Sequence, residues 1–133
     1  MLIVEIECFK EINDRYGHSA GDQVLINVAD TIRRVFEKGT ILGRLGGDEF
    51  VVFVYCPMTK EEISIYMEKL KNEIGKIRIE SQKVTCSVGM IPVENGYTIE
   101  KLYRSADRLL YEAKKQGRDQ FVYGSSFEKM GKT

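Results

Sequence analysis

The first seven residues of the chain constrain its fold more than any other segment. Met1 to Val4 are continuously apolar, which is typical of a central strand that is covered on both faces. Glu5 and Glu7 follow where this strand ends, and because side chains alternate along a strand they share one face, with Ile6 on the other. The sequence therefore predicts a sheet covered on both sides, with two carboxylates on one face at the end of a central strand.

Later segments alternate between helical and strand periodicity. The first expected helix runs from Val24 to Phe36, after the polar stretch Glu11 to Ser19, and Gly39 stops it. A hairpin of Ile41 to Leu45 and Phe50 to Tyr55 follows, and then a helix that begins with a capping box of Thr59 and Glu62 and runs to Gly75. The remaining expected elements are strands Lys76 to Glu80 and Val84 to Ile91, a helix from Ile99 to Gln116, and an edge strand Gln120 to Tyr123. This order predicts an α+β fold, in which a largely antiparallel sheet carries helices on its faces.

Length and composition fit one domain. The 133 residues are 43% hydrophobic, which suits a single core formed by residues 1–123, whereas residues 124–133 are polar, without periodicity, and expected to be a flexible tail. Twenty basic and twenty acidic residues cancel, so nothing in the charge balance favours a nucleic-acid partner or contact with a membrane surface. No apolar run approaches the roughly 20 residues that span a bilayer.

The three cysteines lie far apart in the sequence. Cys8, Cys56 and Cys86 are odd in number and lack a C-x-x-C spacing, so we expect buried thiols rather than a disulfide or zinc framework. A reducing cytoplasm is the expected location.

Four acidic residues occupy strand ends or a turn. Glu5, Glu7, Asp48 and Glu49 would be costly if gathered together unless water or cations neutralise them, and Mg²⁺ takes one or two carboxylates together with substrate phosphates. The plainer interpretation is that strands often end in solvated acids and that Gly-Gly-Asp is ordinary turn chemistry. Each acidic pair, taken alone, favours this plainer interpretation.

A longer string changes that balance. "GRLGGDEF", Gly43 to Phe50, resembles the signature of the GGDEF family of diguanylate cyclases, and "FKEINDRYGHSAGD" and "SADRLLYEAKKQGRDQ" resemble its substrate-binding segment and its last helix. The resemblance covers Leu2 to about Tyr123. It implies a nucleotidyl-cyclase-like fold with a ferredoxin-like βαββαβ core. It also implies condensation of two GTP molecules into the bacterial signalling nucleotide cyclic di-GMP, with one GTP in each half of a homodimer.

The resemblance also implies a metal site. Glu5, the backbone carbonyl of Ile6, and Asp48 would bind Mg²⁺, with Mn²⁺ as the alternative ion. Glu49 would support the metal or deprotonate the attacking 3′-hydroxyl, so Asp48 and Glu49 are the expected catalytic residues. Such a site suits metal-assisted phosphoryl transfer.

Guanine and phosphate contacts follow from the same resemblance. Asn13 and Asp22 would read the guanine base and His18 would line the site, while Gly46 and Gly47 would let the backbone approach the phosphates. Taken without the family, Asn13 is a common turn residue, Asp22 fits a capping box with Ser19, and a lone histidine is more often structural.

Three basic residues would contact the triphosphate. Lys114 and Arg118 match the family's phosphate contacts, and Lys10 is a weaker candidate. The alternative for Lys114 and Arg118 is a favourable interaction with the dipole at the end of a helix, which needs no ligand.

The sequence departs from the family in three places. Glutamates stand where the family usually has aspartates, and the extra methylene moves each carboxylate by about 1.5 Å, so we expect weakened metal binding. Residues 37–40, "EKGT", lack the Arg-x-x-Asp product-inhibition motif. The family's amino-terminal helix, its Asp-x-Leu-Thr turn and an upstream sensory or dimerisation domain are not in the chain. Two hypotheses result: an active diguanylate cyclase, or an impaired domain that binds GTP or serves in dimerisation and regulation.

Overall fold

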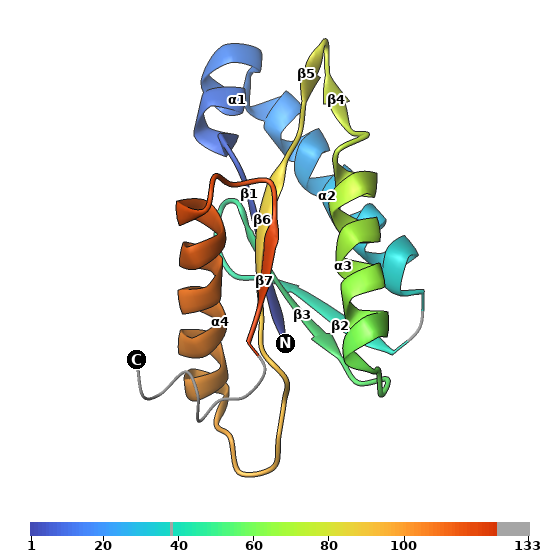
Figure 1. The fold of residues 1–133 in the computed structure, drawn as a ribbon. Helices are drawn as coiled ribbons and strands as arrows, with labels where there is room; N and C mark the ends of the chain where they lie inside the picture. The colour runs from blue at the N-terminus through green and yellow to red at the C-terminus, as the bar shows by residue number, and fades with distance from the viewer. Residues whose placement is uncertain (38, 125–133) are drawn as a thin grey trace.

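The computed structural model describes residues 1–37 and 39–124. They form an alternating series of strands and helices (Figure 1). The elements are β1 (Leu2–Ile6), α1 (Phe9–Tyr16), α2 (His18–Phe36), β2 (Thr40–Arg44), β3 (Glu49–Val54), α3 (Lys60–Ile74), β4 (Arg78–Ile79), β5 (Gln82–Lys83), β6 (Cys86–Met90), α4 (Ile99–Lys115) and β7 (Phe121–Tyr123).

The main sheet has five strands in the order β2-β3-β1-β6-β7. Strand β1 pairs antiparallel with β3 on one side and with β6 on the other, and β7 runs parallel to β6 at the edge. The prediction of a central first strand in a largely antiparallel α+β sheet is therefore confirmed. The hairpin of β2 and β3 and the edge position of β7 also agree with the sequence analysis.

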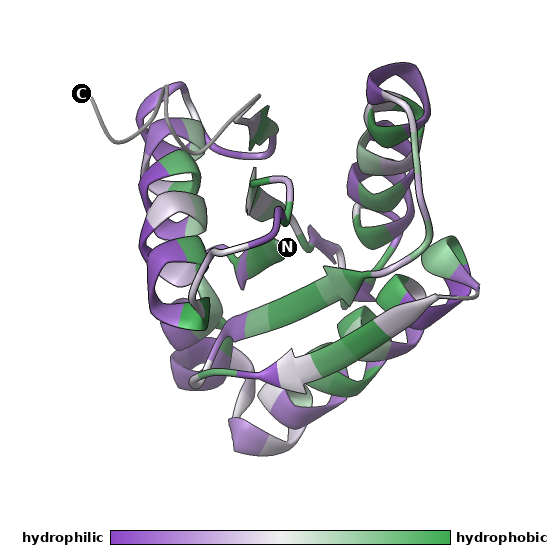
Figure 2. Cartoon of the chain, turned by 90° about the horizontal axis from the view of Figure 1, so that it is seen from below, coloured by the Kyte–Doolittle hydropathy of each residue, from purple (hydrophilic) through white to green (hydrophobic). Residues whose placement is uncertain are grey.

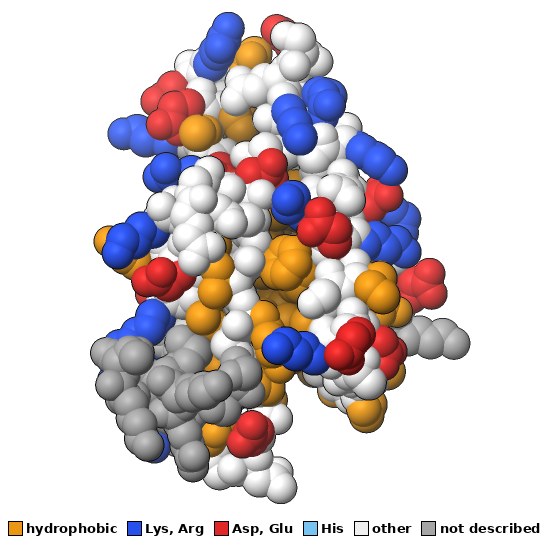
Figure 3. Space-filling view, viewed as in Figure 1, with side chains coloured by type: hydrophobic (Ala, Val, Ile, Leu, Met, Phe, Trp, Pro, Cys, Tyr) orange, Lys and Arg blue, Asp and Glu red, His pale blue; other side chains and the backbone are white. Residues whose placement is uncertain are grey.

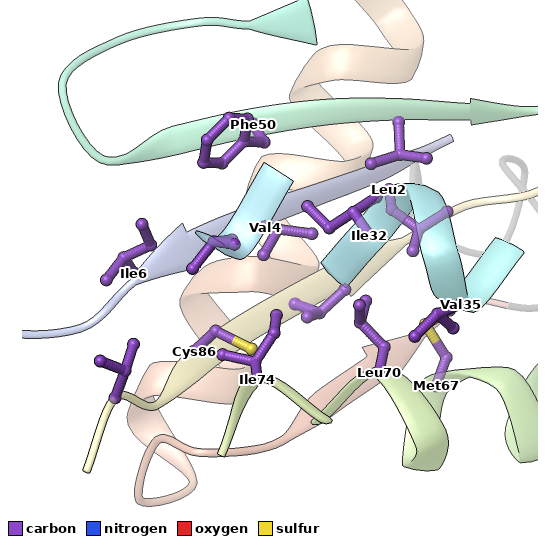
Figure 4. Packing of buried hydrophobic residues seen from close by; sticks show 14 of the residues in the cluster. Leu2, Val4, Ile6, Ile32, Val35, Phe50, Met67, Leu70, Ile74 and Cys86 are labelled. Atoms are coloured by element: carbon purple, nitrogen blue, oxygen red, sulfur yellow. The ribbon is translucent and has the colours of Figure 1, made fainter. Parts of the chain in front are cut away.

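Each face of the sheet has its own core. On one face, Leu2, Val4 and Ile6 pack with residues of α2 and α3, and Figure 4 shows this cluster from close by. On the other face, Met1 and Ile3 pack against α4. Helix α4 stands on the opposite side of the sheet from α2 and α3 (Figure 1), and the helices that flank the sheet turn their hydrophobic sides inward (Figure 2). Alternation along β1 thus serves two separate cores, as expected for a central strand.

The capping box predicted before α3 is present. The Glu62 amide donates to the Thr59 hydroxyl at 3.2 Å, and the Thr59 amide donates to the Glu62 carboxylate at 3.2 Å. The apolar residues predicted to carry this helix are all buried, namely Ile63, Met67, Leu70 and Ile74. Local chemistry therefore fixed the start of α3 correctly.

Two segments differ from the sequence analysis. The stretch Glu11 to Ser19 is helical, because it contains most of α1 and the start of α2, and α2 ends at Phe36 before Gly39 is reached. Phe9, Ile12 and Tyr16 of α1 recur at helical spacing and pack on the core, but this stripe is only three residues long and only Ile12 is buried, so it was not recognised in the sequence. The strand expected over Lys76 to Glu80 is the short β4, which pairs with β5 in a separate two-stranded sheet.

The expectation of three buried cysteines is wrong for two of them. Cys86 is buried, and burial raises the pKa of its thiol, but Cys8 and Cys56 are exposed, and all three are free. Cys8 lies in the turn after β1 with a φ of 56° and Cys56 directly follows β3. Both positions lie outside the packed elements, so hydrophobic residue type did not decide their burial.

The surface carries both signs of charge. Figure 3 shows basic and acidic side chains interspersed over the visible face, in keeping with the balanced composition. Among the helices that the structure describes, none has the length and apolar character needed to cross a membrane. Gly124 donates its amide to the Met90 carbonyl at 2.9 Å, and the rest of the predicted tail, 125–133, lies outside the described residues.

Candidate active site

The acids at the end of β1 and at the tip of the hairpin lie together, as the sequence analysis predicts. Glu5 is the register partner of Glu49 on β3, and the Ile6 amide donates to the Asp48 carbonyl at 2.9 Å. Directly opposite residues of neighbouring strands share a face of the sheet. The pairing of β1 with β3 therefore brings the Glu5, Asp48 and Glu49 side chains to one end of the sheet.

Glu5 also has a register partner on the other side. Ser87 of β6 lies opposite it, so Glu49, Glu5 and Ser87 form a row across three strands. Within the described part of the chain, the buried Oε1 of Glu49 and the buried Oγ of Ser87 have no hydrogen-bond partner. Buried polar atoms normally find a partner. The row is thus a polar site whose hydrogen bonds are incomplete within this chain.

Glu49 is the most perturbed acid of the site. Burial raises its pKa, and the negative charges of Glu5, Asp107 and Asp48 raise it further, while the Lys114 ammonium opposes the shift. A carboxyl whose pKa moves toward neutrality becomes a better proton acceptor near neutral pH. Perturbation of this kind is common where acids do chemistry.

Two α4 residues that act on Glu49 were not identified as site residues from the sequence. Tyr103 hydrogen-bonds the Glu49 carboxylate, whose charge raises the pKa of this phenol, and the Asp107 carboxylate adds negative charge nearby. A signal existed, because Tyr103, Asp107 and Lys114 are spaced by four and seven residues and hence share one side of a helix.

Lys114 occupies the centre of the acidic group. Its ammonium lies 2.5 Å from the Glu5 carboxylate, and both side chains are largely shielded from solvent. Lys114 lies in the last turn of α4 and also pairs with Glu5, so it does more than interact with the helix dipole, which was the alternative considered from the sequence. In this structure Lys114 is the cation that neutralises Glu5.

The oxygen atoms of these residues are of the kind that binds a hard divalent cation, although their side chains do not converge on one point in the structure. No set of three or more His, Cys, Asp and Glu side chains in residues 1–37 and 39–124 is close enough to hold an ion as it stands. The site nevertheless offers oxygen donors, excess negative charge and the unpartnered Oε1 of Glu49. Mg²⁺ prefers such ligands. Glu5, the Ile6 carbonyl, Asp48 and Glu49 are the residues that could hold it.

Glu7 has different partners from Glu5. Its carboxylate is buried, accepts a hydrogen bond from the Asp119 amide at 2.7 Å, and lies 3.7 Å from the Arg118 guanidinium. Both glutamates do face the end of α4, so the shared face is confirmed. Both oxygens of Glu7 are engaged by the connection between α4 and β7, so this carboxylate serves that connection rather than the hairpin tip.

The hairpin tip is shaped by Arg44 of β2. Its Nε and Nη2 donate to the carbonyls of Gly46 and Gly47, both at 2.9 Å, and the Leu45 amide donates to the Glu49 carbonyl at 2.8 Å. A Cβ on either glycine would meet no atom within 4 Å. The space above the two glycines is therefore open to a ligand, as a phosphate-binding loop requires.

The predicted base-reading residues come from α1 and α2. A Cβ on Gly21 would lie 1.8 Å from Oδ1 of Asn13, so the Asn13 amide packs directly on Gly21, the residue before Asp22. Helix α2 begins at His18 after Gly17 and has no side-chain cap, so Asp22 is an exposed residue beyond its first turn. The capping interpretation of Asp22 is therefore wrong, as is the turn interpretation of Asn13, which lies in α1.

The remaining predicted contacts are exposed. His18 is the first residue of α2 and Lys10 lies on α1, each on the surface. Arg118 follows α4, with 62% of its side chain exposed. The structure thus groups Lys114 and Arg118 beside Glu5 and Glu7, whereas His18 and Lys10 remain exposed on α2 and α1.

Comparisons with known proteins agree with this geometry. Residues 1–120 match the family described as "Diguanylate cyclase, GGDEF domain". The chain is 33% identical to the probable diguanylate cyclase DgcT and 34% identical to the diguanylate cyclase DgcM, both of Escherichia coli K12, with 92% of the chain covered in each case. It spans only 28% and 30% of the length of these two relatives.

Solved structures give the same result. The active GGEEF domain of a diguanylate cyclase from Vibrio cholerae is 27% identical, with a TM-score of 0.80 over 92% of this chain and 80% of that one. The GGDEF domain of DgcB from Caulobacter crescentus, solved in complex with c-di-GMP, is 28% identical, with a TM-score of 0.80 over 92% of this chain and 75% of that one. The expected nucleotidyl-cyclase-like fold is therefore confirmed, and the chain belongs to the GGDEF family of diguanylate cyclase domains.

Proposed function

We propose that this domain condenses two GTP molecules into cyclic di-GMP at the acidic end of its sheet. The observation that carries the proposal is the unpartnered, buried Oε1 of Glu49, which lies in a group of acids beside an open glycine turn. A cluster of this kind is costly for the domain on its own. Its cost is accounted for if a cation and a triphosphate complete it.

Mg²⁺ is the cofactor that the donor set suits, with Mn²⁺ as the alternative. Glu5, the Ile6 carbonyl and Asp48 would hold the ion, which when bound supplies neutralisation of charge on the triphosphate and on the leaving group. Lys114 pairs with Glu5 at 2.5 Å, and its ammonium would be free to contact the phosphates if Glu5 held the ion instead. Arg118 is exposed close by and provides a second cation for the same phosphates.

Glu49 accepts the proton of the attacking 3′-hydroxyl. Its raised pKa and its free oxygen suit that role, and the hydrogen bond from Tyr103 holds the carboxylate in place. Asn13 and Asp22 select guanine, because an amide and a carboxylate complement the acceptor and donor edges of the base. His18 and Lys10 remain candidate contacts of the nucleotide.

Catalysis requires two copies of the domain. Each protomer binds one GTP, and the two sites face each other so that each 3′-hydroxyl oxygen attacks the α-phosphorus of the other GTP and displaces its pyrophosphate. The relatives are much longer than this chain, so we further propose that other parts of a longer protein, a sensory or dimerisation module, bring two such domains together. The rate of cyclic di-GMP synthesis would then depend on the effective concentration of one domain near the other, rather than on new contacts within the domain.

Incubation with GTP and Mg²⁺ tests the proposal. The chain is assayed at high concentration and also fused to a parallel coiled coil, with the product identified by mass spectrometry and Asp48→Asn as the matched control. We expect cyclic di-GMP from the fused form, more slowly from the free chain, and none from the Asp48 variant. Absence of product from the fused wild type would refute the cyclase function.

The pairing of Glu5 with Lys114 favours a second candidate, a domain that binds GTP without turning it over. If the longer glutamate cannot leave Lys114 for the metal, the site stays impaired. Glu5→Asp separates the two candidates, because a large rise in turnover would indicate an impaired native site and unchanged turnover would indicate that glutamate is tolerated. Calorimetry that detects no GTP binding would instead leave only a dimerisation or docking role.

A further inference from the structure

The buried carboxylate of Glu7 has no part in the chemistry proposed above. Its side chain is only 6% exposed, yet it carries a charge on the sheet face that α4 covers. Burying an ion without partners costs several kcal/mol. Glu7 has two partners, and both belong to the connection between α4 and β7 rather than to the hairpin tip.

That connection has a demanding backbone conformation. Gly117, Arg118 and Asp119 have φ values of 112°, 64° and 48°, so three consecutive residues lie on the left-handed side. For residues other than glycine this costs roughly 1–2 kcal/mol each. Such a conformation persists only where surrounding contacts fix it.

The contacts that fix it come from two sources. Helix α4 supplies local ones, because the Gly117 amide donates to the Lys114 carbonyl at 3.2 Å and the Arg118 amide donates to the Ala113 carbonyl at 3.1 Å. The Asp119 amide instead donates to Oε1 of Glu7 at 2.7 Å, across 112 residues of sequence. A hydrogen bond to a charged acceptor is among the stronger ones. Glu7 is thus the tertiary anchor of the turn that carries Arg118.

We propose that Glu7 is a positioning residue, which holds the turn after α4 so that the Arg118 guanidinium is presented to the phosphates of the nucleotide. This inference rests on the proposed function. The 3.7 Å ion pair leaves Arg118 loosely held and mostly exposed, so a phosphate can engage it while the backbone stays anchored. Glu5 and Glu7 therefore have matching tasks, since Glu5 holds Lys114 and Glu7 holds the turn of Arg118.

The direction in which one substitution changes GTP affinity distinguishes a positioning role of Glu7 from a purely electrostatic one. Glu7→Gln removes a negative charge near the phosphate site, so a purely electrostatic role predicts tighter binding of GTP. A positioning role predicts weaker binding of GTP, because the turn is no longer fixed by a charged acceptor and Arg118 is no longer oriented towards the phosphates. Glu61→Gln on the exposed surface of α3 is a control outside the proposed nucleotide site, and it removes the same charge without touching the turn.

The test is a double-mutant cycle on GTP affinity, measured by calorimetry with Mg²⁺, using Glu7→Gln, Arg118→Gln and the double variant. We expect each single variant to bind GTP about 3- to 30-fold more weakly, the double variant to bind no more weakly than Arg118→Gln alone, and Glu61→Gln to bind like wild type. Unchanged or tighter binding by Glu7→Gln, or effects that simply add, would overturn the positioning role.

Amide hydrogen exchange gives a second readout that needs no variant. In the wild type without nucleotide, the Asp119 amide should be protected, and rapid exchange at that amide would overturn the anchor even if Glu7→Gln failed to fold. A wild type that binds no GTP, but has a protected Asp119 amide, would refute the proposed function, and the phosphate-directing role with it, while the anchor itself would stand.

Discussion

Replacing Gly21 by alanine should weaken GTP binding while leaving the domain folded. An ideal Cβ at this position would lie 1.8 Å from Oδ1 and 2.8 Å from Cγ of Asn13. The Asn13 backbone is held within α1, where its carbonyl accepts the Gly17 amide at 2.8 Å. The side-chain amide must therefore move, by more than about 1 Å, to restore an ordinary contact distance.

The two consequences differ in size. Alanine in place of glycine within a helix stabilises it by about 1 kcal/mol, and a displaced rotamer of Asn13 costs about 0.5–1.5 kcal/mol. The free energy of unfolding should therefore change by less than about 1 kcal/mol. An amide moved by this distance would lose the hydrogen bond that we propose it makes to guanine, worth about 0.5–1.5 kcal/mol, or roughly 2- to 10-fold in the dissociation constant.

Calorimetry with GTP and Mg²⁺, together with a thermal melt, checks both numbers. Asn13→Ala is the matched control, and Gly21→Ala should bind GTP about as weakly, with no further loss in the double variant. If Gly21→Ala bound GTP as tightly as wild type while Asn13→Ala did not, the packing of Asn13 on Gly21 would have no bearing on base recognition, and the reasoning would be refuted.

Three further variants test other parts of the account. Gly89→Ala should destabilise the domain by about 3 kcal/mol, because its Cβ would lie 2.2 Å from the Ala106 carbonyl oxygen of α4, and a denaturant melt would measure this. Thr59→Ala should cost about 1 kcal/mol in the same melt through loss of the capping box, with GTP affinity unchanged since α3 carries none of the proposed nucleotide contacts. Glu49→Gln should abolish turnover yet stabilise the fold at neutral pH. Because folding raises the pKa of Glu49, the ionised carboxylate destabilises the fold above that pKa. The stabilisation by glutamine should therefore vanish below the ordinary pKa of 4.5, where the carboxyl is protonated in both the folded and the unfolded state. Equal stabilisation at pH 7 and pH 4 would contradict the assigned shift.

Much of the fold could be predicted from local patterns. Three features depend only on neighbours within a few residues and can therefore be recognised from the sequence alone. They are the apolar run at the start of β1, the capping box before α3 and the helical spacing of α4. The meeting of Glu5 with the hairpin acids also followed, because adjacent antiparallel strands bring strand ends together. Assigning roles to the remaining site residues needed the family resemblance.

The parts that were wrong depend on partners far away in the sequence. Glu7 is anchored to Asp119, and Tyr103 to Glu49, through the packing of α4 on the sheet, which no local pattern encodes. Helix α1 was not predicted because its apolar face is short: it consists of Phe9, Ile12 and Tyr16, of which only Ile12 is buried. Burial of the cysteines likewise followed position in the fold rather than residue type, and only Cys86 lies on a central strand.

The most direct measurement is a crystal structure of this chain with Mg²⁺ and a GTP analogue that cannot react. The account predicts a metal ion bound by Glu5, the Ile6 carbonyl and Asp48, with the Lys114 ammonium moved from Glu5 to the phosphates and the guanine base between Asn13 and Asp22. A nucleotide bound elsewhere, or Glu5 still paired with Lys114 and no metal at the hairpin tip, would contradict it.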